Sequence, residues 1–397
     1  MGLIEAFKNL YFTSGIGEII NTFLDGGYKT VIMLVLACVL LYLAIVKKYE
    51  PLLLLPIAFG MLLANLPLAN LVAVKVLEEG MEPGLMYYLY RGVAYEIFPP
   101  LIFLGIGCMT DFGPLIANPK SLLLGAAAQV GIFGTYVGAR LLDLTPWFSF
   151  SKLEAAAVAI IGGADGPTAI YTAGKLAEHL VPTIAIAAYS YMALVPVIQP
   201  PIMRALTTKK ERSVVMTQLR TVSKTEKIIF PIAVTIFVAL VLPSAATLVG
   251  MLMLGNLIKE SGVCERLCKT ASNELMNIIT IMLGVSVGAT ATAEKFLDLK
   301  TIGIMILGVC AFALSTAFGV LFGKLMYWIS GGKINPLIGA AGVSAVPMAA
   351  RIAQKVGREE NPNNYLLMHA MGPNVAGVIG SSLASGIFIS MLGSLVG

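Results

Sequence analysis

Charged side chains are scarce in this chain: Asp, Glu, Lys and Arg make up 12% of its 397 residues, whereas a soluble globular domain carries about 25%. The five cysteines lack the spacing of a zinc site. The sequence contains no phosphate-binding loop, no nucleophile elbow and no pair of carboxylates arranged for hydrolysis. It also lacks a stretch that combines basic and aromatic residues, which speaks against a nucleic-acid partner. If the chain transports ions, ATP does not drive that transport directly.

The sequence consists largely of long uncharged, apolar runs. Hydrophobic residues make up 57% of the chain and the mean hydropathy is +0.86. A helix needs about 20 apolar residues to cross roughly 30 Å of hydrocarbon. Uncharged windows long enough to cross lie at 30–46, 51–74, 121–139, 181–203, 228–258, 275–293, 301–323 and 361–397. Shorter or interrupted windows lie at 97–110, 155–174 and 334–350. The sequence therefore predicts an all-α polytopic membrane protein with about eleven transmembrane helices.

The longest polar segment, 204–227, contains seven basic and two acidic residues. Basic loops between membrane spans stay in the cytoplasm, so we place this loop inside. Residues 1–50 are expected to form a surface segment and a first transmembrane helix, because the chain start lacks the basic region and apolar core of a signal peptide. Counting crossings outward from the loop puts the N-terminus inside and the C-terminus outside.

The segments on either side of this loop resemble each other. The run GMLLANL in the first half recurs as GMLMLGNL in the second, and Pro167 recurs as Pro347, 180 residues later. We therefore expect two copies of one unit, 51–203 and 228–397. Each copy holds about five crossings, and because this number is odd, the two copies lie with opposite orientations and bring their broken helices together at the midplane.

One carboxylate, Asp165, stands in the stretch IIGGADGPTAIYTAG, where glycine and proline interrupt an apolar run. A second interrupted stretch, MHAMGPNVAGVIGSSLASG, contains the amide of Asn374. Lipid tolerates such breaks only where the backbone is buried in protein or lines a wet cavity. A charged carboxylate at a helix centre costs about 2.5–3.5 kcal/mol, so a cation, a proton or a basic partner must accompany Asp165. A cation or proton site is the preferred interpretation, and a buried salt bridge to Arg351 is the alternative.

Six residues from the two units are expected to line one cavity with polar groups: Asp165, Tyr191, Asn335, Ser344, Arg351 and Asn374. Hard cations such as Na+ take oxygen ligands, which these side chains and the freed glycine carbonyls supply. Arg351 has two open interpretations, a bidentate contact with a planar carboxylate or a long side chain that reaches the membrane interface. On these residues alone, a secondary sodium/proton antiporter or a sodium-coupled carboxylate transporter fits as well as an enzyme.

Five long motifs resemble those of a known family: FLGIGCMTDFGPLIANPK, GGADGPTAIYTAGKLA, AAYSYMALVPVIQPP, NPLIGAAGVSAVPMAAR and NYLLMHAMGPNVAGVIGSS. Together they are similar to the membrane-embedded β subunit of the sodium-pumping biotin-dependent decarboxylases. These complexes act on oxaloacetate, methylmalonyl-CoA, glutaconyl-CoA or malonate. The resemblance covers the chain from about residue 51 to residue 390.

The resemblance implies a primary sodium pump in the cytoplasmic membrane of a bacterium or archaeon. In the family, a carboxyltransferase α subunit moves a carboxyl group from the substrate to biotin on a mobile carrier domain. The β subunit then decarboxylates the carboxybiotin, consumes a proton and exports Na+. A small γ or δ subunit with a single helix and a homo-trimer of β subunits are also implied. The identity of the acid would then be decided by another subunit.

The resemblance also assigns roles to residues that match the family's motifs. Asp165 and Asn374 match its sodium and proton site, and Arg351 matches an arginine needed for activity, which we place beside the incoming carboxybiotin. The expected ligands of Na+ come from both halves of the chain: Asp165, Tyr191, Asn335, Gly339, Ser344 and Asn374. The expected catalytic residues are Asp165, Tyr191, Ser344 and Arg351.

Overall fold

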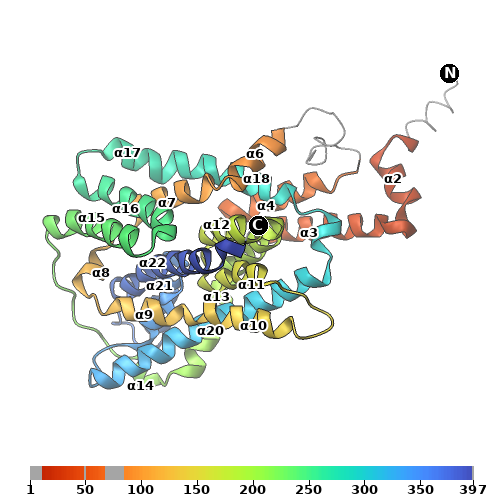
Figure 1. Ribbon diagram of the computed structural model, residues 1–397. Helices are drawn as coiled ribbons and strands as arrows, with labels where there is room; N and C mark the ends of the chain where they lie inside the picture. The colour runs from red at the N-terminus through yellow and green to blue at the C-terminus, as the bar shows by residue number, and fades with distance from the viewer. Residues whose placement is uncertain (1–10, 49–50, 68–84, 396–397) are drawn as a thin grey trace.

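The computed structural model describes residues 11–48, 51–67 and 85–395 (Figure 1). Every regular element in this part of the chain is a helix, which confirms the expected all-α fold. The helices of the first half are, in order, α2 (Gly15–Asn21), η1 (Phe23–Gly27), α3 (Tyr28–Ile45), α4 (Pro51–Ala64), α6 (Leu85–Ala94), α7 (Phe98–Met109), α8 (Gly113–Ala117), α9 (Ser121–Ala128), α10 (Val130–Leu142), α11 (Lys152–Ala159), η2 (Ile160–Gly163), α12 (Gly166–Leu176), η3 (Glu178–Leu180) and α13 (Val181–Leu206). Those of the second half are α14 (Lys209–Arg212), α15 (Lys224–Val241), η4 (Pro243–Ala245), α16 (Ala246–Ser261), α17 (Glu265–Thr270), η5 (Ala271–Leu275), α18 (Met276–Ala289), α19 (Ala293–Phe296), α20 (Leu299–Ile329), η6 (Pro336–Gly342), α21 (Met348–Glu360), α22 (Leu367–Leu392) and η7 (Gly393–Leu395).

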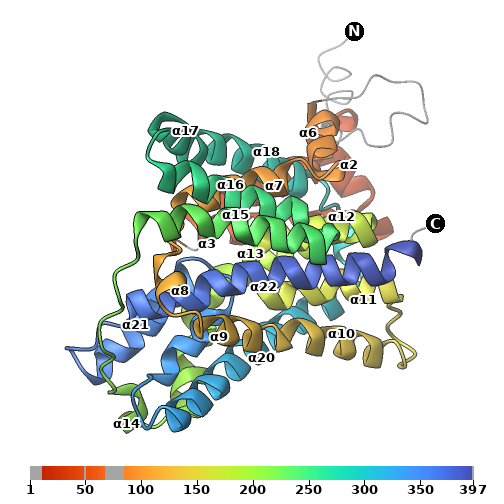
Figure 2. The ribbon, with the colours of Figure 1, turned by 60° about the vertical axis from the view of Figure 1, so that its left-hand side comes forward.

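The longer helices form a bundle whose members run roughly along one direction. Figure 2 shows α9 and α10 following one another beside α22, with α15 above them. Among the described residues, four helices are long and apolar enough to cross a membrane alone, and the number rises to six if each of two bent helix pairs counts as one span. A polytopic membrane protein is thereby confirmed, and the count of about eleven spans stays a prediction.

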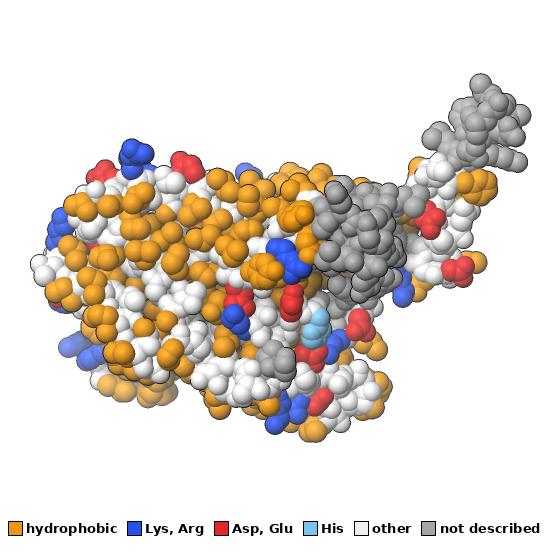
Figure 3. Space-filling model, turned by 45° about the horizontal axis from the view of Figure 1, so that its top comes forward, with side chains coloured by type: hydrophobic (Ala, Val, Ile, Leu, Met, Phe, Trp, Pro, Cys, Tyr) orange, Lys and Arg blue, Asp and Glu red, His pale blue; other side chains and the backbone are white. Residues whose placement is uncertain are grey.

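The outer surface of the bundle is apolar, as contact with lipid requires. On α15, for example, Ile236, Phe237 and Leu240 are 56–78% exposed. Figure 3 shows hydrophobic side chains spread over a broad face, with charged side chains in a few separate groups. A soluble monomer rarely exposes a contiguous apolar patch of this extent, so lipid is the natural neighbour of this face.

The long apolar window 228–258 contains two helices and not the single crossing that we expected. α15 ends at Val241, and Leu242 adopts φ −141° and ψ 78°, outside the helical region. Pro243 follows, and a proline restricts the preceding residue to extended conformations and supplies no N–H to a helix. The chain therefore turns between α15 and α16, which pack against each other as neighbours.

The 155–174 window does not cross the bundle but forms a hairpin, which we call hairpin 1 (residues 152–180). α11 and η2 lead into the bundle, and α12 returns packed against α11. Nε2 of His179, just after α12, lies 2.8 Å from Oε1 of Glu154 in the first turn of α11. Nζ of Lys300 donates to the same carboxylate at 2.6 Å. The two ends of hairpin 1 therefore lie at one end of the bundle.

The 334–350 window belongs to a second hairpin, hairpin 2 (residues 336–360), built from η6 and α21. Asn335, before η6, donates through Nδ2 to two carbonyl oxygens of the loop 207–214, both at 2.9 Å. Asn361, after α21, donates to a third carbonyl of this loop at 3.2 Å. The same loop therefore holds both ends of hairpin 2, and this window does not cross the bundle either.

The two hairpins enter the bundle from opposite ends. α13 begins at Val181, directly after hairpin 1, and ends at Leu206, next to the loop that holds hairpin 2. A 26-residue helix is long enough to span a bilayer even though it is bent by 59°. In Figure 2, α11 and α12 accordingly lie toward the right of the bundle and α21 toward the left.

Glycines bring helices of the two halves into backbone contact. A Cβ atom on Gly60 of α4 or on Gly288 of α18 would overlap a backbone carbonyl of the other helix. Gly107 of α7 and Gly255 of α16 face each other in the same way. Small residues allow this close approach, which replaces the hydrophobic driving force that helices lack in lipid.

The start of α2 and the end of α22 lie at the same end of the bundle (Figure 2). The expected orientation, with the N-terminus inside and the C-terminus outside, stays a prediction. The number of crossings behind it changes, because two of the interrupted windows turn back and the window 228–258 divides into two helices.

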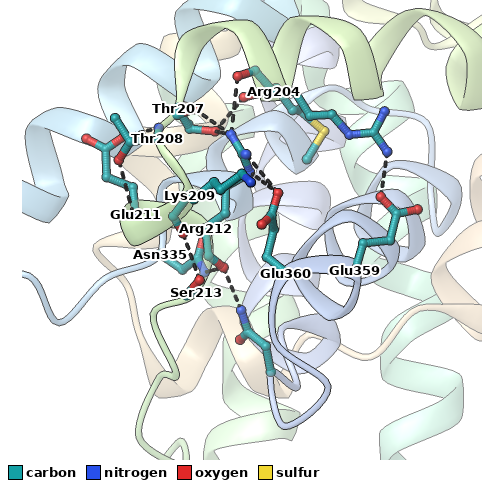
Figure 4. A network of polar contacts seen from close by, with 12 residues as sticks. Arg204, Thr207, Thr208, Lys209, Glu211, Arg212, Ser213, Asn335, Glu359 and Glu360 are labelled. Carbon is teal, nitrogen blue, oxygen red and sulfur yellow. Dashed lines mark hydrogen bonds and ion pairs between the residues drawn. The ribbon is translucent and has the colours of Figure 1, made fainter.

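Arg212, at the end of α14, is the centre of the contacts that hold hairpin 2 (Figure 4). Its side chain is 7% exposed, and Nε and Nη2 donate to Oε1 of Glu360, the last residue of α21, at 3.0 and 2.7 Å. Nη1 donates to the carbonyls of Thr207 and Arg204 at 2.5 and 3.2 Å. One guanidinium thus joins the end of α13 to the base of hairpin 2.

We expect Arg212→Ala to lower the thermal unfolding midpoint of the detergent-solubilised protein clearly. The substitution leaves Glu360 and two carbonyls without their donor, and breaking a buried pair of this kind costs roughly 3 kcal/mol. Arg220→Ala is the control, because Arg220 pairs with Glu226 at the exposed surface and such pairs contribute little. Equal midpoints for the two variants would show that Arg212 does not hold the hairpin.

Candidate functional site

The tips of the two hairpins meet inside the bundle. Ser344, between η6 and α21, donates its backbone N–H to the carbonyl of Gly163 at 3.0 Å. Gly163 ends η2, at the tip of hairpin 1. Both residues are buried, so two interrupted helices that enter from opposite ends satisfy each other's freed backbone groups away from lipid.

Local sequence explains why hairpin 1 turns at this point. Ala164 adopts the left-handed conformation with φ 52°, which stops η2. Asp165 then takes an extended conformation and caps α12, since its Oδ1 accepts from the N–H of Thr168 at 3.2 Å. Pro167 in the first turn of α12 needs no N–H partner. The break that we inferred from glycine and proline is therefore a helix end followed directly by a helix start.

The carboxylate of Asp165 is 5% exposed and accepts a second hydrogen bond at Oδ2, from Oγ of Ser381 at 2.7 Å. Ser381 Oγ is also 3.2 Å from Oγ of Ser344. Ion pairs among the described residues do not include Asp165. The alternative of a salt bridge between Asp165 and Arg351 is therefore not what the structure has, and the carboxylate is held by hydroxyl and amide donors alone.

Asn374 of α22 is fully buried and reaches the tip of hairpin 2. Its Nδ2 donates to the carbonyls of Ala341 and Val343 at 2.9 and 2.7 Å. Its Oδ1 has no hydrogen-bond donor. Ser381 connects Asp165 to Ser344, and Asn374 contacts Val343, the residue before Ser344. A buried acceptor oxygen without a donor is suited to a cation.

Sequence reasoning missed Ser381, although a signal for it was present. Ser381 follows Asn374 by seven residues on the same helix, which places both on one face. The motif NYLLMHAMGPNVAGVIGSS ends on this serine. A search along the helix face that contains Asn374 would have found it.

Gly339 lies where η6 packs against α20. A Cβ atom on Gly339 would overlap the carbonyl oxygen of Gly319, and a Cβ on Gly319 would overlap the carbonyl of Gly339. The two glycines therefore let the backbones of hairpin 2 and α20 touch, which sets the depth of the hairpin tip.

Two of the expected cavity residues lie elsewhere. The hydroxyl of Tyr191 donates to the carbonyl of Met305 in α20 at 2.5 Å. Nδ2 of Asn335 donates to carbonyl oxygens of the loop 207–214, and its Oδ1 accepts from the N–H of Leu337 at 3.0 Å. Nearer backbone groups therefore already satisfy Tyr191 and Asn335. Of the six expected residues, only Arg351 is among those that line the cavity described next, so the structure does not show the single shared cavity that we expected.

Arg351, in the first turns of α21, lines a cavity of about 390 Å³ that lies between the two hairpins and helices α4, α7, α13 and α18. Other parts of the wall come from Pro167 of hairpin 1, Pro347 of hairpin 2 and Tyr189 of α13. The guanidinium is exposed and takes part in none of the ion pairs or side-chain hydrogen bonds of the described residues. A cation without a partner at the wall of such a cavity can bind an anionic group.

Comparisons with known proteins decide the family. The family model for the Na+-transporting oxaloacetate decarboxylase β subunit matches residues 29–392. This chain belongs to that family. Methylmalonyl-CoA decarboxylase subunit β of Propionigenium modestum is 58% identical over 98% of this chain and 100% of its own length. Glutaconyl-CoA decarboxylase subunit β of Acidaminococcus fermentans is 59% identical over 91% and 93%. Oxaloacetate decarboxylase β chain 2 of Salmonella typhi is 52% identical over 94% and 98%.

Membership of this family confirms the resemblance found in the sequence. This β subunit is the membrane component of a sodium-transporting decarboxylase, and such complexes consist of several subunits. The alternative of a plain secondary transporter receives no support from these relatives. Relatives named for three different substrates match the chain at 52–59% identity, so the β subunit's sequence does not follow the substrate closely.

We expect Ser381→Ala to raise the Na+ concentration that half-saturates decarboxylation about tenfold. Hydrogen bonds to charged groups contribute roughly 1.5–3 kcal/mol, and about 1.4 kcal/mol corresponds to a factor of ten. Ser382→Ala is the matched control, because Ser382 is equally buried and bonds only to the carbonyl of Val378. If both variants respond to Na+ as the unmodified protein does, Ser381 does not support the Asp165 site.

Proposed function

We propose that this chain decarboxylates carboxybiotin delivered by a partner subunit, consumes a proton and exports Na+. The observation that carries the proposal is the position of Asp165. It is a buried carboxylate without an ion pair, at the junction of two hairpins that enter from opposite ends. A carboxylate in this position needs a mobile cation or a proton.

The oxygens around Asp165 suit Na+ as the transported ion. Na+ is a hard cation that prefers oxygen ligands. We assign its site to the carboxylate of Asp165, Oδ1 of Asn374 and the hydroxyl of Ser344, with backbone carbonyls of the hairpin tips. A proton and Na+ compete for the same carboxylate, so binding of one releases the other. Tyr191, Asn335 and Gly339 remain predicted members of the sodium site by family resemblance. Their contacts with neighbouring backbone groups fix the helices that surround the site.

The cavity beside Arg351 suits carboxybiotin. Its volume of about 390 Å³ lies within the range of small-molecule sites, and the guanidinium offers a bidentate contact to a carboxylate. Decarboxylation breaks the bond between the ureido nitrogen and the carboxyl carbon. Carbon dioxide leaves, the electron pair stays on the ureido group, and the consumed proton ends on the nitrogen. The apolar part of the wall removes water from the carboxylate, which favours its release as carbon dioxide.

We infer that two inverted units, 51–203 and 228–397, perform the transport step after the surface segment and first helix of residues 1–50. The reciprocal packing of α4 on α18 and of α7 on α16 supports two such units. The hairpins with α10, α13, α20 and α22 would move as one block against the scaffold of α4, α7, α16 and α18. The shift would open the Asp165 site to one side of the membrane and then to the other.

The end of the bundle at the loop 204–227 is assigned to the cytoplasm because of its basic residues. The end of α22 would then face the outside, as expected for the C-terminus. The membrane is assigned as the cytoplasmic membrane of a bacterium or archaeon. We assign the carboxyltransferase α subunit, the biotin carrier domain and a single-helix γ or δ subunit as partners. A homo-trimer of β subunits is the expected assembly. The acid that is decarboxylated would be selected by the α subunit.

Asp165→Asn is expected to abolish Na+-dependent decarboxylation and to leave carboxyl transfer to biotin intact, because the amide cannot exchange a proton for Na+. Both reactions are measured with the purified complex. Asp298→Asn serves as the control, since Asp298 is exposed at the start of α20. Normal stimulation by Na+ in the Asp165 variant would remove this residue from the mechanism.

Avidin tests the part of the proposal that concerns biotin. Membrane vesicles that contain the complex are expected to lose Na+ uptake when avidin is added with access to the carrier domain, because a sequestered biotin cannot deliver its carboxyl group. Uptake is followed with radioactive Na+. Uptake that continues in avidin would point to a secondary transporter.

A further inference from the structure

Tyr189 presents a buried hydroxyl group that nothing in the described structure satisfies. The residue lies on α13 and is 1% exposed, and its Oη has no hydrogen-bond partner. Native proteins pair the large majority of buried polar groups, so an unpaired hydroxyl needs an explanation. The same side chain lines the cavity that Arg351 lines. The natural partner of this hydroxyl is a molecule that enters the cavity.

Hairpin 1 is shaped to accommodate this tyrosine. Gly166, the first residue of α12, lies directly under the ring, and a Cβ atom at this position would overlap the ring edge of Tyr189. Gly166 follows Asp165 in the chain. The absence of a side chain at residue 166 therefore seats the tyrosine against the hairpin tip, next to the residue assigned to Na+.

Tyr191, two residues along the same helix, provides the contrast. Its hydroxyl donates to the carbonyl of Met305, so it is already engaged between α13 and α20. Two residues along a helix correspond to a rotation of about 200°. Only one of these tyrosines can therefore face the cavity, and the structure selects Tyr189.

We propose that Tyr189 is a further substrate-binding residue, whose hydroxyl donates a hydrogen bond to the ureido oxygen of carboxybiotin while Arg351 holds the carboxylate. This inference rests on the proposed function. When the bond between nitrogen and carboxyl carbon breaks, the electron pair on the nitrogen spreads onto the ureido oxygen. A fixed donor at that oxygen stabilises the charge until the consumed proton reaches the nitrogen. The tyrosine itself loses no proton in this step.

The test compares Tyr189→Phe with Tyr136→Phe in the purified complex, with free carboxybiotin as the substrate. Removing one donor from a developing oxyanion lowers kcat by roughly 100- to 1,000-fold, so we expect Tyr189→Phe to lower kcat about 100-fold. The half-saturating Na+ concentration should not change. The thermal midpoint should stay equal or rise, since an unpaired buried hydroxyl is removed. Tyr136 packs on Phe388 away from the cavity, so its variant should behave like the unmodified protein.

Three results would contradict the inference, and they are distinct from a failure of the proposed function. An unchanged kcat would remove Tyr189 from the reaction. A loss of kcat that accompanies a lower thermal midpoint, or a shifted Na+ requirement, would assign the hydroxyl to structure or to the ion site. If the unmodified complex does not decarboxylate free carboxybiotin in a Na+-dependent way, the proposed function itself is wrong.

Discussion

The hydrogen bond from Ser344 N–H to the Gly163 carbonyl is the contact on which the rest of the site depends. Each hairpin contains backbone groups that no helix satisfies, and lipid offers them no partner. Some of these backbone groups are satisfied because the tips of the two hairpins meet and bond to each other. Side chains of neighbouring helices do the rest: Ser315 donates to the Gly162 carbonyl at 2.6 Å and Gln199 to the Ala340 carbonyl at 3.0 Å. These contacts hold a polar core inside an apolar bundle.

The unsatisfied groups of the protein are informative because so much else is satisfied. The carboxylate of Asp165 has donors but no counter-charge, Oδ1 of Asn374 and Oη of Tyr189 have no partner, and Arg351 has no anion. Such groups destabilise a fold unless a ligand completes them. Asp165 and Asn374 lie at the two hairpin tips, and Tyr189 and Arg351 line the cavity beside them. If Asp165 binds Na+ and Arg351 holds the substrate, as proposed, decarboxylation takes place beside the ion site.

The bases of the hairpins are held by a different kind of contact. At one end of the bundle, the Glu154 carboxylate pairs with both His179 and Lys300, and at the other end Arg212 donates to the Glu360 carboxylate. Ion pairs with several hydrogen bonds lie at the ends of the bundle, where contact with water lowers the free-energy cost of desolvating the charges. Single hydroxyl contacts lie in the middle. The hairpins are therefore anchored firmly at their bases, while the tips are joined by neutral contacts that an ion or proton can rearrange.

The sequence by itself determined that the chain is a helical membrane protein, where its helices break, and that Asp165, Ser344 and Asn374 belong together. Apolar length, glycine, proline and a lone carboxylate are local properties, and they can be read without coordinates. Tertiary structure alone decided that the broken stretches turn back, that Asn335 anchors a hairpin base, and that Tyr189 faces the cavity where we expected Tyr191. After a helix breaks, the direction of the chain depends on which distant backbone groups can satisfy the freed ones. Likewise, the face that a helix turns toward a cavity depends on all of its packed neighbours.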